Sequence, residues 1–142
     1  MDTFEIGISK IKDIEFLVDE SIAVSSPDAI SINFEVNLNV NAELKMLDLV
    51  LTVKYLYNGE QNFLKIKTSN VFLVPSFDQL GKDDNGDLLL PDGLLVTMLS
   101  LSISHTRALL AKNSLGTKFS DYYLPIVNPA ELAADLFGIK QQ

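Results

Sequence analysis

The sequence LPIVNPAEL, residues 124–132, has the pattern of a loop that leads into a helix, and this helix is one of the features that indicate the fold class. Asn128 is a good N-cap, Pro129 fits the first helical position, and Glu131 stands where a capping box places its acid. Gly138 is placed to end the helix, because glycine readily adopts the left-handed conformation found there. The segment therefore predicts a short terminal helix over residues 129–137.

A longer helix is predicted upstream, over residues 92–115, with Asn113 or Gly116 as its end. Apolar or small side chains surround much of its circumference, from Leu94 to Leu110. A helix that is apolar on most sides is buried on most sides. One four-stranded sheet covers only one stripe of such a helix, so we expect a second subunit to cover the rest.

Alternation of apolar and polar residues predicts strands before these helices, over residues 3–74. The clearest strand is Ile30 to Val40, whose even-numbered residues are apolar while the residues between them are polar. Residues 4–18 alternate as well, from Phe4 onwards, but the phase shifts near Lys12-Asp13, which predicts a bulge.

Two further strands are predicted as a hairpin. Residues 47–57 alternate, Asn58-Gly59 is the strongest hairpin signal in the chain, and the return strand starts at Phe63. That strand is expected to end near Val74, because Pro75 cannot donate a hydrogen bond to a sheet. With a loop over residues 75–91, the prediction is one α+β domain spanning residues 1–142. It has a four-stranded antiparallel sheet with the long helix and the short C-terminal helix packed on one face.

Composition excludes several classes of function. The net charge is −8 and Arg107 is the only arginine, so we expect no nucleic-acid partner. The N-terminus carries no secretory signal, and the apolar stretch of residues 88–103 is interrupted by Pro91 and is too short to span a bilayer. We expect a cytoplasmic protein with no membrane insertion. The absence of cysteine fits a reducing compartment and excludes thiolate chemistry.

No residue pattern indicates catalysis, a metal or a cofactor. Asp83, Asn85 and Asp87 have the spacing that opens a calcium loop, but Leu88 and Leu94 occupy the positions of its glycine and bidentate glutamate. His105, the only histidine, has serines nearby but no orienting acid. We therefore interpret the protein as not an enzyme.

The order of elements, together with three short segments, resembles the SecB export-chaperone family. The segments are IKDIEF (residues 11–16), NFL (62–64, with Val71-Phe72 further along) and LPIVN (124–128). The resemblance implies this same α+β fold, assembly into a dimer or a dimer of dimers, and a chaperone that holds unfolded precursor polypeptides. It also implies delivery to the SecA motor.

A holding protein needs an apolar groove that accepts many sequences, and flexible or aromatic side chains suit it. The candidate groove residues are these: Met46, Phe72, Leu132, Leu136 and Phe137. For each of them, simple core packing is the alternative interpretation.

The resemblance also implies an acidic docking face for SecA on the exposed side of the sheet. Asp13 matches one acidic position, but Leu17, Lys65 and Lys67 stand where further acids are expected. These departures predict weak binding to SecA. They favour, as an alternative, a chaperone dedicated to one client such as an antitoxin. An adaptor protein and a carrier of a small ligand on the same fold remain open as well.

Overall fold

The computed structural model describes residues 5–122 and 124–138. It contains β1 (Gly7–Val18), β2 (Ile30–Asn41), β3 (Met46–Tyr57), β4 (Gln61–Leu73), α1 (Asp92–Asn113) and α2 (Pro129–Phe137). The expected strand start at Phe4 lies outside the described residues. Single 3-10 turns at Pro27–Ala29 and Phe77–Gln79 precede β2 and follow β4.

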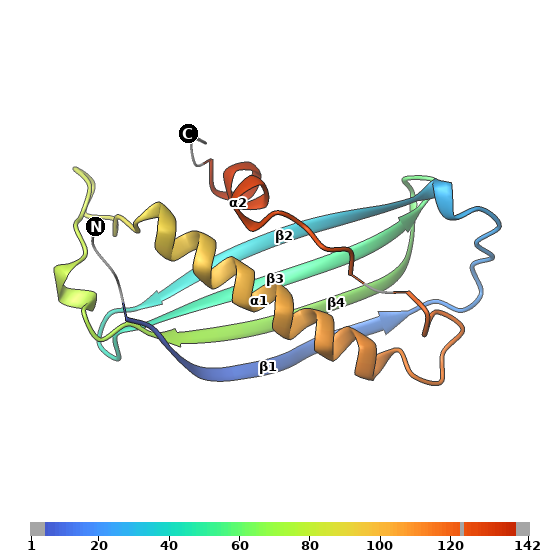
Figure 1. Cartoon of the computed structure of the whole chain (residues 1–142), viewed down its shortest axis with the longest axis horizontal. Coiled ribbons are helices and arrows are strands. Elements are labelled where there is room, and N and C mark those ends of the chain that lie inside the picture. The colour runs from blue at the N-terminus through green and yellow to red at the C-terminus, as the bar shows by residue number, and fades with distance from the viewer. Residues whose placement is uncertain (1–4, 123, 139–142) are drawn as a thin grey trace.

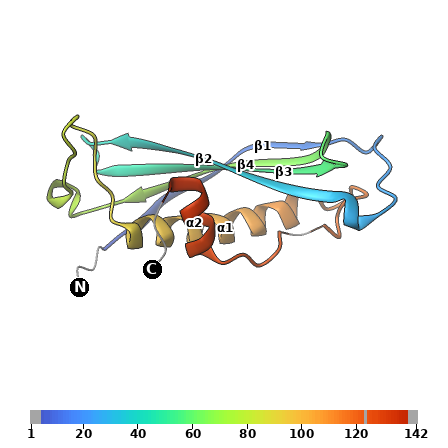
Figure 2. The same ribbon diagram turned by 90° about the horizontal axis from the view of Figure 1, so that it is seen from above.

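The four strands form one antiparallel sheet in the order β1-β4-β3-β2, so β1 and β2 are its two edges. Both helices lie on the same side of this sheet (Figure 2). α1 crosses the strands diagonally, and α2 lies beside β2 (Figure 1). The predicted α+β fold, with both helices packed on one face, is confirmed. We call the side without helices the open face.

The predicted turn and cap residues occupy the positions expected of them. Asn58 and Gly59 both have positive φ angles, 55° and 72°, which the tight turn between β3 and β4 requires. At α2, Asn128 Oδ1 accepts hydrogen bonds from the backbone N–H groups of Ala130 (2.9 Å) and Glu131 (3.2 Å). Gly138 ends this helix at a φ of 70°.

The predicted bulge in the first strand is present, and a second bulge accompanies it. The pairing of β1 with β4 shifts between Asp13 and Glu15, and again between Ile8 and Lys10. Because each bulge inserts one unpaired residue, the side chains beyond it change faces. The phase shift in the sequence is therefore a physical feature of the strand.

The core lies between α1 and the central strands. The alternate residues Leu47, Leu49, Leu51, Val53 and Tyr55 of β3 are at most 2% exposed. Phe63, at a register shift between β3 and β4, packs against the rings of Phe119 (4.9 Å between centroids) and Tyr122 (5.7 Å). These contacts anchor the segment after α1 to the sheet.

α1 is long and apolar enough to cross a membrane by length and composition alone. Core helices of soluble proteins pass the same test, and this helix packs on the sheet. Its buried residues are Leu94, Leu95, Met98, Leu99, Ser102, Ile103, Thr106 and Leu110. The buried set includes two polar residues, and Thr106 Oγ1 lies 2.8 Å from Thr68 Oγ1 of β4.

Candidate functional site

The helices cover the sheet unevenly, and this leaves apolar side chains accessible along β2. The inward-facing residues of β3 are fully buried, whereas their cross-strand partners in β2 are only partly buried. We call this row the inner β2 surface; it comprises Ile32, Phe34, Val36, Leu38 and Val40. Val40, at its end, is 48% exposed although its partner Leu47 is fully buried.

The inner β2 surface lies on an edge strand. Among the residues that the structure describes, β2 pairs only with β3, so the other side of its backbone is not part of the sheet. An edge strand presents free N–H and C=O groups to which an extended peptide can add. Apolar side chains and an unpaired backbone edge therefore occur on the same strand.

α2 borders this surface. Its contacts are with α1 and β2, and its N-cap fixes where it begins. Ala133 is fully buried, while Leu132, Leu136 and Phe137 are partly buried against the core. The structure thus brings these last three predicted groove residues together, next to the inner β2 surface.

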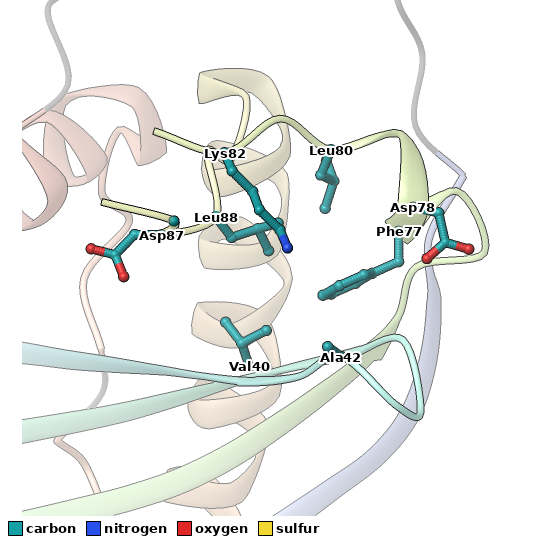
Figure 3. A pocket seen from close by; sticks show the side chains of 9 residues that line it. Val40, Ala42, Phe77, Asp78, Leu80, Lys82, Asp87 and Leu88 are labelled. Atoms are coloured by element: carbon teal, nitrogen blue, oxygen red, sulfur yellow. The ribbon is translucent and has the colours of Figure 1, made fainter. Parts of the chain in front are cut away.

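A pocket of about 430 Å³ lies at the far end of β2 and extends the apolar surface. Val40 and Ala42 form one wall, and Phe77, Leu80 and Leu88 of the loop before α1 form the other (Figure 3). The remaining residues that line this end pocket are Asp78, Lys82, Gly86 and Asp87. It therefore combines apolar walls with charged side chains of both signs.

The loop that forms this pocket is held by its own hydrogen bonds. Asp83 Oδ1 accepts from the backbone N–H groups of Asn85 and Asp87, each at 2.9 Å. The N–H of Leu89 donates to Gly81 O at 2.8 Å, and Lys45 pairs with Asp78 at 3.1 Å. Asp83, which begins the calcium-like spacing, thus serves as a turn acceptor. Among the described residues no group of three or more acidic or histidine side chains is placed to hold a metal ion.

A smaller hollow, about 280 Å³, lies between α1 and the segment before α2. Arg107 donates from its guanidinium to Leu124 O (3.5 Å) and Pro125 O (3.3 Å), which holds that segment against α1. Ile126, the next residue, is 94% exposed. The single arginine therefore positions an exposed apolar side chain.

Two predicted groove residues lie elsewhere. Phe72 is fully buried in the core on the helix side, which agrees with the alternative interpretation of simple core packing. It is the cross-strand neighbour of Leu47 on the helix side of the sheet. Met46 is partly buried and pairs with Asn41 and Leu73 at the end of the sheet, apart from the residues of α2.

Asp13 does not lie on the open face, where the docking prediction placed it. It pairs with Thr68, whose side chain faces α1, and its carboxylate accepts a hydrogen bond from Asn113 Nδ2 at 2.7 Å. The bulge at Ile14 separates it from Glu15, which turns to the other face. Leu17, Lys65 and Lys67 do lie on the open face, as their register shows.

His105 of α1 belongs to a polar network between helix and sheet, whereas the hydroxyl of Ser102 does not. His105 Nδ1 lies 2.9 Å from Asn70 Oδ1, and burial lowers the pKa of this histidine. Ser102 is fully buried, with no hydrogen-bond partner for its hydroxyl among the described residues. This arrangement gives Ser102 no access to a substrate from solution.

Sequence reasoning missed the inner β2 surface and the end pocket. The alternation in β2 shows that one of its faces is apolar, but not that this face is left partly uncovered. Residues 75–91 are predicted only as a loop, although Phe77 and Leu80 are apolar residues within it. Two apolar residues in an otherwise Gly- and Asp-rich loop are the sequence signal that could have indicated the end pocket.

No protein-family model matches this sequence, and no curated protein matches it. Among solved structures, the chain is similar to a Mycobacterium tuberculosis SecB-like chaperone in complex with a peptide from the HigA1 antitoxin. The TM-score is 0.53 at 8% identity, over 87% of this chain and 90% of that one. It also matches a Streptococcus agalactiae protein of unknown function, with a TM-score of 0.45 and 9% identity, over 89% of this chain and 99% of that one. At such low identity the likeness concerns architecture alone: with its four-stranded antiparallel sheet, long helix and short C-terminal helix, the chain has a divergent SecB-like α+β fold.

Proposed function

We propose that this protein is a molecular chaperone that holds unfolded polypeptides on the inner β2 surface, between α2 and the end pocket. The observation that carries the proposal is the half-covered apolar row of β2 on an edge strand. In a strand of the core, such as β3, the inward-facing side chains are fully covered by other parts of the protein. An exposed apolar row beside a free backbone edge suits an extended chain.

The free energy of burying apolar side chains favours binding of many different client sequences. Fully burying one large aliphatic or aromatic side chain contributes about 1.5–3 kcal/mol. Two or three apolar client residues at alternate positions therefore contribute about 3–9 kcal/mol. This is comparable with the cost of association and of ordering the client, so useful affinity also requires further contacts. Backbone pairing along β2 adds affinity without reading the sequence of the client.

The fold supports the same proposal. The M. tuberculosis SecB-like chaperone was solved with an antitoxin peptide. We propose two classes of client for this chain: export precursors handed to SecA, and a single dedicated partner such as an antitoxin. We further propose that it acts in the cytoplasm, as a homo-oligomer and without catalysis.

The test measures the anisotropy of a fluorescently labelled, permanently unfolded polypeptide as the protein is added, together with suppression of aggregation of a denatured protein. Val40→Asp places a carboxylate in the proposed surface at a position already half exposed, so the fold should tolerate it. We expect about tenfold weaker binding, since a buried carboxylate opposes apolar contact.

Leu17→Asp is the matched control. Leu17 is 53% exposed, close to the 48% of Val40, but it lies on the open face at the opposite edge of the sheet. Its substitution should leave the affinity for the unfolded chain unchanged. Equal losses in both variants, or no binding by the unaltered protein, would overturn the proposal.

A dye that reports exposed apolar surface separates the remaining alternatives. The unfolded polypeptide should displace the dye from a chaperone, whereas a small apolar molecule should displace it from a ligand carrier. An adaptor protein should lose dye signal to neither competitor.

A further inference from the structure

The open face of the sheet carries an unexpected concentration of positive charge. Five of the ten lysines of this acidic chain project from it, against three acidic residues. The register places on this face Lys10, Lys12, Lys54, Lys65 and Lys67, together with Glu15, Glu35 and Asp48. Neither helix covers this side (Figure 2).

The three acids on this face already have partners. Glu15 pairs with Lys65 and Glu35 pairs with Lys54, each at 3.2 Å, while Asp48 accepts a hydrogen bond from Ser69 at 2.7 Å. Within the described part of the chain, Lys10, Lys12 and Lys67 form no ion pair and no side-chain hydrogen bond. The charge left uncompensated on the open face is therefore positive, although the protein as a whole carries −8.

Two of these free lysines line one depression. Its volume is about 410 Å³, and Lys12 and Lys67 border it from neighbouring strands. The other residues around it are Ile14, Asn37, Leu38, Asn39, Asp48, Val50 and Ser69. It offers two ammonium groups, two amides and the apolar side chains of Ile14 and Val50 within one hollow, with the single carboxylate of Asp48 held by Ser69. Leu38 belongs to the helix side of the sheet by its register.

We propose that the open face binds a short acidic polypeptide segment at this depression, separately from the holding of clients on the other side of the sheet. Carboxylates of the segment contact Lys12 and Lys67, and an apolar side chain between them packs against Ile14 and Val50. Charge complementarity selects this occupant, because the unpaired groups are cationic on an otherwise acidic protein. A long polyanion is disfavoured by the acidic remainder of the molecule.

The experiment uses two labelled peptides that differ only in charge: one alternating glutamate with leucine, and the same peptide with glutamine in place of glutamate. We expect the acidic peptide to bind and the glutamine peptide to bind at least about tenfold more weakly. Added salt should weaken the acidic complex, because the contacts are exposed ion pairs.

The variant Lys12→Glu/Lys67→Glu should weaken binding of the acidic peptide by about tenfold or more. The matched control is Lys112→Glu/Lys118→Glu, which changes the net charge equally at exposed sites away from the open face and should leave binding unchanged. Circular dichroism verifies that each variant is folded. Equal affinity in the two double variants would overturn the proposal, as would equal binding of the glutamine peptide.

Two other outcomes would also overturn it. If the charge-reversed variant changes the oligomeric state, the open face is an interface between copies of this chain. If a single-stranded oligonucleotide binds more tightly than the acidic peptide, the occupant is a nucleic acid. Val40→Asp should leave acidic-peptide binding intact, so failure of the client-holding proposal and failure of this one give different results.

Discussion

His105 of α1 and Asn70 of β4 form a hydrogen bond of 2.9 Å between Nδ1 and Oδ1, across the interface of helix and sheet. The amide nitrogen of Asn70 donates to Leu49 O at 3.0 Å and to Thr68 Oγ1 at 3.1 Å. Because the amide oxygen can only accept, Nδ1 of His105 carries the hydrogen. The fully buried Asn70 thus ties the helix to two neighbouring strands.

This pair predicts a loss of stability on acidification. Burial lowers the pKa of His105 below its value in the unfolded chain, about 6.5. As the pH falls through about 6.5 the unfolded state takes up a proton first, so the free energy of unfolding decreases until the lowered folded pKa is passed. Urea unfolding at pH 7.5 and 5.5 measures the difference.

His105→Gln is the control for that measurement. The chain has no other histidine, so the variant should lose most of the pH dependence in this range. A pH dependence equal to that of the unaltered protein would show that another group is responsible.

Removing the amide of Asn70 should be costly. Asn70→Ala removes the side-chain hydrogen bonds to Leu49 O and His105 Nδ1, and we expect a loss of about 2–4 kcal/mol in the free energy of unfolding. Asn37→Ala, on the exposed side of β2, should change it by less than about 0.5 kcal/mol. Chemical denaturation of both variants makes the comparison, and equal effects would contradict the role assigned to Asn70.

Substitutions in the terminal helix α2 test client holding without changing the sheet. Phe137→Asp and Leu136→Asp should each weaken binding of an unfolded polypeptide, because a carboxylate opposes contact between apolar surfaces. Both positions are partly exposed, so the protein should remain folded. Ala133→Asp is the contrasting variant, because Ala133 is fully buried and this change should undo the docking of α2. Outright unfolding by either of the first two changes would place them in the core instead.

Association into a dimer or larger assembly is a further prediction. On the helix side of the edge strand β1, Ile8 and Ile11 are 48% and 45% accessible. Apolar groups on an unpaired edge are usually covered by another chain. Multi-angle light scattering at micromolar concentration should therefore give at least twice the mass of one chain, 15.7 kDa. A stable monomer would contradict the prediction.

The positions of the strands and helices could be predicted well from the sequence, because the conformational preferences of single residues determine where they begin and end. Positive φ at Asn58 and Gly59, the cap at Asn128 and the stop at Gly138 each follow from the conformational preference of a single residue. The bulge was visible as a phase shift because an inserted residue changes the face of everything after it.

The surface was harder to predict than the fold. Alternation in β2 tells which face is apolar, but it does not tell how far a covering helix extends. Phe72 and Phe137 are the same residue type, yet one is fully buried and the other only partly. That difference depends on how the helices and loops pack over the sheet, which no local pattern encodes.

The last prediction concerns SecA. An acidic docking face should respond to charge and salt, yet the open face here carries Leu17, Lys65 and Lys67, and Asp13 lies on the helix side. We therefore expect any binding to SecA of the same organism to be weak and salt-sensitive. Client holding is driven by apolar burial and should survive added salt. Titration of the two proteins at low and moderate ionic strength, with an unfolded polypeptide measured in parallel, distinguishes the two interactions. Tight binding to SecA that resists salt would show that a different surface docks the motor, and that this chain serves general export.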